Sequence, residues 1–398
     1  MRQTWAILFD AYRELNAKKL FWITLALSGL VVVAFAMVSL TPKGIKVIVW
    51  EFPSPLNLSI LSNATFYKLM FQNLGIKFWL TWAATILGLV ATCSMIPDFT
   101  AGGAVELTLS KPIGRARLFL TKYLAGLLFM FLQVTVFSVA ALLVIGVRGR
   151  EWVPSVLLAV PIVTLTYSYL FCVCAVVGLL TRSTIFSLIA TLIVWLGVFA
   201  VHTVESGVML QLRVAAETNV ERTKERLARL DAGEKVSVEA EPNAGPKVGG
   251  PGGLMGSIVS AIKPKPTATR EQLEEKLREH EADLDKWTKW HRGLFALKTV
   301  LPKTTETTDL LERSIFKKGE MDLFNDDQVD RAERSQRQMR EQFGNGDDGE
   351  ARMGDVRLAR EIDKRLKERS VWWVVGTSIL FQGAVLGFGC WWFGRRDF

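Results

Sequence analysis

Very few residues of this sequence are grouped in the way that catalysis or metal binding requires. The chain has three histidines and four cysteines, and neither set has the spacing of a metal site. No glycine is followed by lysine, so the phosphate-binding loop of nucleotide hydrolases is absent. The patterns His-Glu-x-x-His, Cys-x-x-Cys and Gly-x-Ser-x-Gly are absent too. We therefore expect that the chain is not an enzyme and that it binds no cofactor and no metal.

The cysteines and two histidines lie at positions that packing explains. A thiol within an apolar run behaves as a small buried hydrophobe. His280 and His291 follow an apolar repeat of helical spacing, which predicts packing positions; a ligand or pH-sensing role is the alternative. All four cysteines fall within apolar runs: Cys93, Cys172, Cys174 and Cys390.

Six long apolar runs dominate the chain, of which 50% is hydrophobic. About 20 apolar residues cross a bilayer, and each run is close to that length. The sequence therefore predicts an all-α polytopic membrane protein with six transmembrane helices. The expected spans are 20–40, 78–96, 123–147, 152–180, 184–203 and 371–393.

The expected spans carry no Asp, Glu, Lys or Arg in their interiors. Ion-coupled transporters usually hold ionisable groups at mid-membrane, so this absence favours a pathway that is opened by energy applied from outside the spans. Some uncharged polar residues do occur there, and both helix–helix hydrogen bonding and substrate contact can explain them. They are Gln133, Tyr167, Tyr169 and Gln382.

Charge predicts the topology. The net charge is +9, and the excess lies beside the spans, while the region 204–370 is nearly balanced. This distribution points to membrane lipid and not to nucleic acid. Lys and Arg are more frequent in the short flanks on the side of the two termini, so we expect a cell (inner) membrane protein with both termini in the cytoplasm. Residues 2–19 predict an amphipathic helix in the membrane interface.

The region between the fifth and sixth spans is an expected extracytoplasmic, mostly helical insert. Helices are predicted over 216–230 and 269–300, with a Gly/Pro-rich linker over 242–256. The expected domains are the transmembrane domain 1–203, the insert 204–370, and a last span with a cytoplasmic tail, 371–398. The second helix has a coiled-coil-like seam whose partner lies either within the insert or on another chain. The seam consists of Leu273, Leu277, His280, Leu284, Trp287, His291 and Leu294.

A polar connection from Pro97 to Tyr123 separates the second and third spans and should face the cytoplasm, because it is basic. A short helix is predicted over Thr100–Ser110. The connection contains Ile96-Pro-Asp98, Gly102-Gly103, Glu106-Leu-Thr-Leu-Ser-Lys-Pro112, Arg115 and Lys122-Tyr-Leu-Ala-Gly126. These residues, in this order and between these spans, resemble the membrane subunits of type-2 ABC transporters, the exporter permeases.

The resemblance covers roughly residues 1–205 and 371–398, and it implies a function. A separate ABC ATPase subunit would bind the cytoplasmic face, with the loop 98–118 seated in its cleft as a coupling helix. A second permease copy or a similar chain would complete the translocation path. For the basic residues of the loop, plain topology signalling is the alternative. The residues implied in ATPase contact are Asp98, Glu106, Lys111, Arg115 and Arg117.

Two other hypotheses belong to different classes. The chain could be a membrane-anchored scaffold whose insert recruits an extracytoplasmic partner through the seam. A membrane enzyme with its site in the insert is the third, and the missing catalytic patterns weigh against it.

Overall fold

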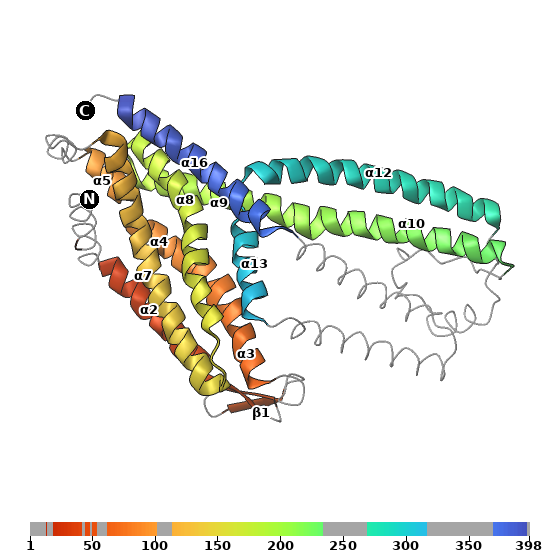
Figure 1. Ribbon diagram of the computed structural model, residues 1–398, viewed down its shortest axis with the longest axis horizontal. Helices are drawn as coiled ribbons and strands as arrows, with labels where there is room; N and C mark the ends of the chain where they lie inside the picture. Colours follow the sequence, from red (N-terminus) through yellow and green to blue (C-terminus); the bar gives the residue numbers. More distant parts are fainter. Residues whose placement is uncertain are drawn as a thin grey trace, which may run out of the picture. The chain divides into compact units, whose positions relative to one another are not determined.

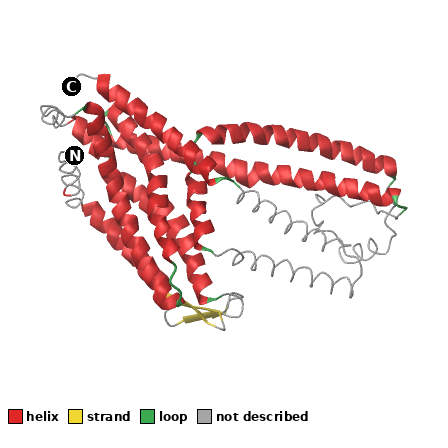
Figure 2. Ribbon diagram, viewed as in Figure 1, coloured by secondary structure: helices red, strands yellow, loops and turns green. Residues whose placement is uncertain are grey.

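The computed structural model describes residues 13, 19–41, 44–47, 50–53, 62–101, 114–233, 269–316 and 369–395. Nearly all of this described chain is helical, with one small sheet (Figure 2). Most of the expected amphipathic helix 2–19 and the whole linker 242–256 lie outside the described residues.

The chain divides into two compact units. The membrane unit consists of Met1–His202, Lys298–Phe324 and Ser370–Phe398. The insert unit consists of Thr203–Leu297 and Asn325–Arg369. The segment from Lys298 therefore packs with the spans, although the sequence assigns it to the insert.

Within the described residues, six helices are long and apolar enough to cross a membrane. The expectation of a mostly helical chain with several apolar helices of spanning length is thereby confirmed, and these helices fit a multi-pass membrane protein. Figure 1 shows how these helices are arranged within the membrane unit. Five of them contain α2 (Lys19–Met37), α7 (Arg115–Gly149), α8 (Ala159–Thr181, preceded by the 3₁₀-helix η2, Pro154–Leu158), α9 (Thr184–His202) and α16 (Val371–Arg395).

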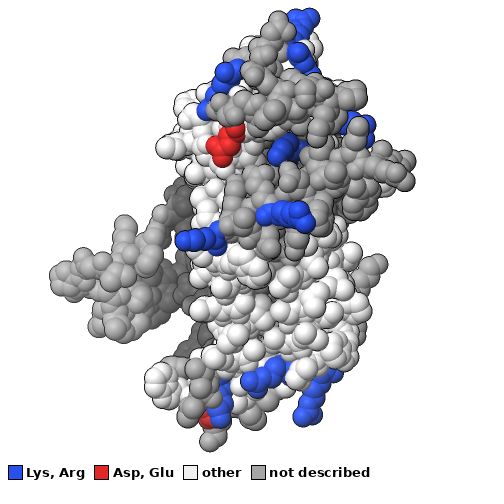
Figure 3. All heavy atoms as spheres, turned by 90° about the vertical axis from the view of Figure 1, so that its left-hand side faces the viewer, with Lys and Arg blue, Asp and Glu red and all other residues white. Residues whose placement is uncertain are grey.

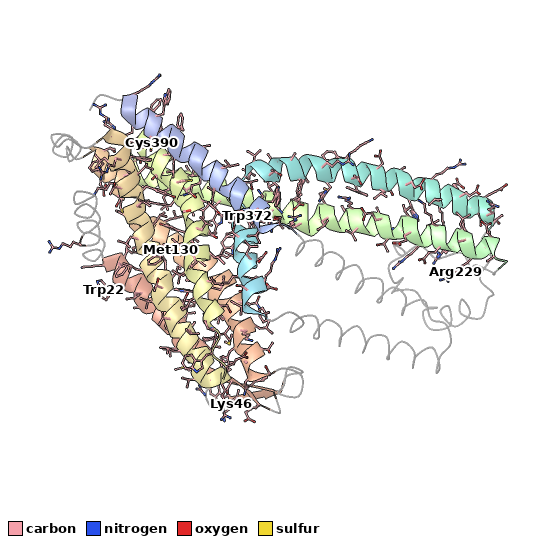
Figure 4. The ribbon with its side chains drawn as sticks, in the orientation of Figure 1. Trp22, Lys46, Met130, Arg229, Trp372 and Cys390 are labelled. Carbon is pink, nitrogen blue, oxygen red and sulfur yellow. The ribbon has the colours of Figure 1, made fainter. Side chains whose placement is uncertain are left out.

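Most of the long helices pack one side inward and expose large apolar side chains on the other, whereas α8 lies inside the bundle and is buried over most of its length. Met130 is fully buried within the bundle, whereas Trp22 lies on its outer surface with 54% of its area exposed (Figure 4). Leu380 of α16 is 73% exposed. Such a surface is unfavourable in water and is covered by lipid chains in a bilayer. On the face shown in Figure 3, basic side chains lie above and below a band of uncharged residues.

The second long helix starts well before the expected residue 78. Ser62 caps it by accepting a hydrogen bond from the backbone N–H of Thr65 (3.1 Å). The helix then contains a long π-helical stretch, a form that widens the turn and is otherwise rare. Its segments are α3 (Asn63–Met70), the π-helix η1 (Phe71–Ala84), α4 (Thr85–Thr92) and α5 (Met95–Ala101).

This early start brings two lysines into the helix. Lys68 is fully buried, and its Nζ lies 3.4 Å from Oε2 of Glu151. Lys77 lies 3.0 Å from Oε2 of Glu312. The second helix is therefore free of charge only over the expected range 78–96, because its extension carries cations that acidic side chains neutralise.

A three-stranded antiparallel sheet follows α2. Its strands β1 (Val38–Thr41), β2 (Gly44–Val47) and β3 (Trp50–Pro53) pair in that order. The stretch from Ile45 to Phe52 is rich in β-branched and aromatic residues, which is typical of a strand, and the register pairs these two residues. The hydroxyl of Tyr67 in α3 donates to the carbonyl of Val38 (2.7 Å), which ties the sheet to the second long helix.

Helix α13 (Thr304–Ile315) belongs to the membrane unit. It packs against α8, α9, α16, η1 and η2. Leu311 is fully buried and Ile315 is 2% exposed. The expected insert 204–370 is thus interrupted by a segment whose own apolar face is covered by the spans.

The insert unit contains the π-helix η3 (Thr203–Met209), α10 (Leu210–Asp231) and α12 (Arg270–Val300), whose end from Lys298 is part of the membrane unit. Side-chain contacts show that α10 and α12 run antiparallel. Arg213 meets His291 (3.5 Å), Thr223 meets His280 (3.1 Å) and Asp231 meets Arg270 (3.5 Å). The seam on α12 therefore finds its partner within the insert.

Candidate functional site

The structure places three of the five expected coupling residues. Asp98 lies in the first turn of α5, and Arg115 and Arg117 lie in the first turn of α7. Glu106 and Lys111 lie outside the described residues, as does most of the short helix expected over Thr100–Ser110.

Arg115 joins the start of α7 to the end of α16. Its Nη1 donates to the carbonyl of Gly394 at 3.3 Å. The last carbonyls of a helix lack partners within the helix and carry partial negative charge, so a guanidinium is favourable there. Phe119, one turn further along α7, packs against Phe393 with ring centroids 6.3 Å apart. These two contacts fix α16 on α7 at this end of the bundle.

Helix α5 is held against α8 and α7 at the same end. A Cβ atom on Gly178 of α8 would lie 3.1 Å from Cγ of Pro97, so the two backbones are close. The Nζ of Lys122 lies 5.4 Å from the ring centre of Phe99 in a cation–π contact. The two described helices that flank the polar connection, α5 and α7, therefore pack directly on each other.

Basic side chains gather at this end of the membrane unit. Arg182 follows α8 in a left-handed conformation (φ 53°) that ends the helix, with its N–H on the carbonyl of Gly178 (2.9 Å). Arg395 packs on Trp391, with 4.5 Å from the guanidinium carbon to the ring centre. The basic groups are Arg115, Arg117, Lys122, Arg182 and Arg395, beside the acidic Asp98.

A buried polar cluster lies between α7, α8 and α16. The hydroxyl of Tyr123 donates to the carbonyl of Ser168 (2.9 Å) and accepts from Nε2 of Gln382 (3.0 Å). The Oγ of Ser168 donates to Oε1 of Gln382 (3.1 Å). Gln382, 259 residues from Tyr123, thus shares one closed set of hydrogen bonds with the neighbouring helices α7 and α8, which fixes the mutual positions of the three helices.

A second polar cluster joins α2, η1 and α7. Nε2 of Gln133 donates to the carbonyl of Thr24 (2.9 Å) and to Oγ of Ser28 (2.5 Å), and Nε1 of Trp79 donates to the same Oγ (2.9 Å). The hydroxyl of Tyr167 is 2.7 Å from Oγ1 of Thr92. Helix–helix hydrogen bonds thus account for Gln133, Tyr167 and Gln382.

Sequence reasoning missed the charged contacts of α13. Besides Glu312, Lys77 has Asp309 at 3.8 Å, and Lys298 pairs with Glu306 at 2.8 Å. Burial raises the pKa of Asp309 to about 6, although Lys77 acts in the opposite direction. The sequence could have predicted an acidic helix face here, because Glu306, Asp309 and Glu312 recur every three residues and so share one side of a helix.

Lys303, which precedes α13, is held by α16. Its Nζ donates to Oγ1 of Thr377 (2.5 Å) and lies 4.2 Å from the ring centre of Trp373. Its backbone N–H donates to Oγ of Ser378 (3.0 Å). These contacts anchor the start of α13 on the last span.

The remaining candidates for chemistry are the cysteines and the two histidines of the seam. Among the described residues no group of three or more His, Cys, Asp or Glu side chains is arranged to hold a metal ion. All four cysteines lie in the described part of the chain, and none of them forms a disulfide. His280 and His291 lie in the seam between α10 and α12, as the helical repeat predicts.

Comparison with known proteins gives no match: no family model, no curated protein and no solved structure corresponds to this chain.

Proposed function

We propose that the chain is the membrane-spanning permease subunit of an ATP-driven ABC exporter, and that a separate ATPase subunit hydrolyses the ATP. One observation carries the proposal. The two helices that flank the polar connection, α5 and α7, pack on each other and on α8 and α16 at a single basic end of the membrane unit. Because its flanking helices contact several spans, a movement of the connection caused by a protein outside the bilayer would be transmitted to those spans.

Two contacts would transmit the movement of the connection to the spans. Movement at Asp98 and α5 reaches α8 through the close approach of Pro97 to Gly178. Movement at the start of α7 reaches α16 through the hydrogen bond from Arg115 to Gly394. Closely packed helices move as rigid bodies, because their interiors resist deformation. In the proposed complex Glu106, Lys111 and Arg117 complete the contact with the ATPase.

The proposed topology follows from the same assignment. The basic end faces the cytoplasm with both termini, in the cell (inner) membrane. The insert unit lies on the other side, and a second permease copy or a similar chain completes the path. Lipid covers the apolar outer surface, and nucleic acid has no role.

The test is co-purification of an ATPase with the full chain in mild detergent. The double variant Arg115→Glu/Arg117→Glu is expected to lose most of the ATPase and most of the stimulation of ATP hydrolysis. Arg148→Glu/Arg150→Glu, at the opposite end of the same helix, is the matched control and should retain both. Undiminished association in the first variant would contradict the coupling assignment.

The scaffold hypothesis relies on a seam that seeks a partner. In the insert unit α10 contacts that seam at His280 and His291, and Leu273 and His291 are buried. The seam thus has contacts within the insert itself, so the exporter hypothesis is the one we pursue.

A further inference from the structure

Glu205 is the most deeply buried carboxylate in the described part of the insert unit, with no exposed area. It lies in the π-helix η3, directly after α9. Its Oε1 is 2.8 Å from Nη2 of Arg369 and 3.2 Å from Nε2 of His291. A buried carboxylate is costly unless charged or hydrogen-bonding groups compensate it, and the guanidinium of Arg369 does so.

The partners of Glu205 come from distant parts of the chain. Arg369 is 164 residues away and lies two residues before the start of α16 at Val371. His291 belongs to α12, which returns along α10. The carboxylate of Glu205 therefore lies in η3, where the insert unit begins, and contacts both Arg369, where that unit ends, and α12.

Surrounding groups complete the cluster. Phe295 stacks on the imidazole of His291 with centroids 6.0 Å apart and also lies under the guanidinium of Arg369 at 5.7 Å. Nη1 of Arg213 approaches Nδ1 of His291 at 3.5 Å. We call these five residues, Glu205, Arg213, His291, Phe295 and Arg369, the root cluster.

The backbone at Glu205 is also unusual. Residues 184–231 form one continuous helix, and its only departure from α-helical geometry is the π-helical segment Thr203–Met209. A π-helical turn inserts an extra residue, and such turns are frequent at functional sites. Here the wider turn lies between the span α9 and the insert helix α10, and it carries the anchoring carboxylate.

We propose that Glu205 is a positioning residue that locks both ends of the insert and α12 into one rigid root. A role of this lock in transport rests on the proposed exporter function. The lock itself is a property of this chain and is tested on the chain alone.

The experiment is amide hydrogen exchange on the full chain in lipid nanodiscs. Loss of a buried charge partner is strongly destabilising, and hydrogen exchange reports local opening. Glu205→Ala and the near-isosteric Glu205→Gln are expected to speed exchange of residues 287–295 in α12, by about a hundredfold for alanine. Exchange near Arg270 should stay unchanged, because that end of α12 is held separately by Asp231. Glu205→Gln decides the question if the alanine variant does not fold.

Two further variants separate the lock from a local helix effect. Glu217→Gln on α10 removes a partly exposed pair with Arg213 (3.1 Å) and should leave residues 287–295 protected. The exchanged pair Glu205→Arg/Arg369→Glu should restore protection. Faster exchange confined to residues 203–209, or no restoration in the exchanged pair, would overturn the proposal.

A second arm addresses the proposed function separately. With the co-purifying ATPase trapped by ATP and vanadate, exchange in α12 should change in the wild-type chain and not in Glu205→Ala. If no ATPase binds, the exporter assignment fails, while the comparison on the chain alone still decides whether the lock exists.

Discussion

Gly126 of α7 faces the ring of Phe171 of α8 so closely that a Cβ atom at this glycine would lie 2.3 Å from Cζ of the ring. The ring cannot move aside, because it stacks between Tyr123 and Tyr167 with centroids 5.3 and 5.6 Å away. Gly126→Ala is therefore expected to destabilise the protein by about 1–3 kcal/mol, the usual range for overpacking. Thermal unfolding in detergent measures this change.

The matched control is Gly383→Ala in α16, where no heavy atom lies within 4 Å of the added Cβ. Alanine is the better helix former by about 1 kcal/mol, so this variant should be neutral or slightly more stable. An equal loss of stability in both variants would show that the close approach of Gly126 to Phe171 does not cause the destabilisation.

The hydrogen bond between Tyr123 and Gln382 is expected to couple α7 to α16. Tyr123→Phe and Gln382→Leu each remove it, so the double variant should lose less stability than the two single losses added together. Hydrogen bonds between membrane helices contribute about 0.6 kcal/mol on average, and the coupling energy should be of that size. A double-mutant cycle from unfolding midpoints measures it, and strict additivity would contradict the assignment.

Asp309 predicts a pH dependence of stability. Its pKa is about 6 in the folded protein, raised by burial and by Glu312 and Glu306 and lowered by Lys77 and Arg313, whereas an unfolded aspartate titrates near about 3.9. Between these values the folded state binds more protons, so the free energy of unfolding falls as pH rises from about 4 to about 6 and levels off above.

Asp309→Asn should remove that contribution. The variant is expected to be more stable than the wild type at pH 7 relative to pH 4, by no more than about 1 kcal/mol, because a side chain that is 39% exposed is screened by solvent. Unfolding midpoints across this pH range provide the measurement, with the exposed Asp283→Asn on α12 as control. A larger relative stability of the variant at pH 4 would reverse the predicted sign.

The ion pair between Lys298 and Glu306 is nearly buried, with side chains 4% and 8% exposed. Glu306→Ala should destabilise the membrane unit by about 3 kcal/mol, because it leaves a buried cation without its carboxylate. The double variant Lys298→Met/Glu306→Leu should recover most of that loss, since an apolar pair of similar volume replaces the ions. Unfolding in detergent compares the two, and a double variant no better than the single one would contradict the interpretation.

Much of the fold was accessible from the sequence, because spanning length and apolar content are local properties. The runs that became α2, α7, α8, α9 and α16 are visible without any tertiary information. The seam on α12 was also local, because its spacing depends on one helix alone. The early start of the second long helix at Asn63 could not be predicted from the sequence, because Lys68 and Lys77 lower the hydropathy of that stretch.

The candidate coupling end of the membrane unit could be predicted only in part from the sequence. The order of residues from Asp98 to Arg117 singled out the connection, but Gly178, Gly394 and Phe119 gave no sign that they brace it. A glycine in an apolar run has the same local appearance whether or not another backbone lies against it. Its significance depends on which helix packs there.

The sequence by itself determined which stretches are apolar enough to be buried away from water and where aromatic and basic residues flank them. It also showed that one helix of the insert has an apolar seam that needs a packing partner. Only the tertiary structure decided where the charges could go. Glu312 neutralises Lys77 across 235 residues, and Arg369 neutralises Glu205 across 164 residues. The physical reason is that hydropathy depends on each residue separately, whereas a buried charge is tolerated only beside a partner that folding brings to it.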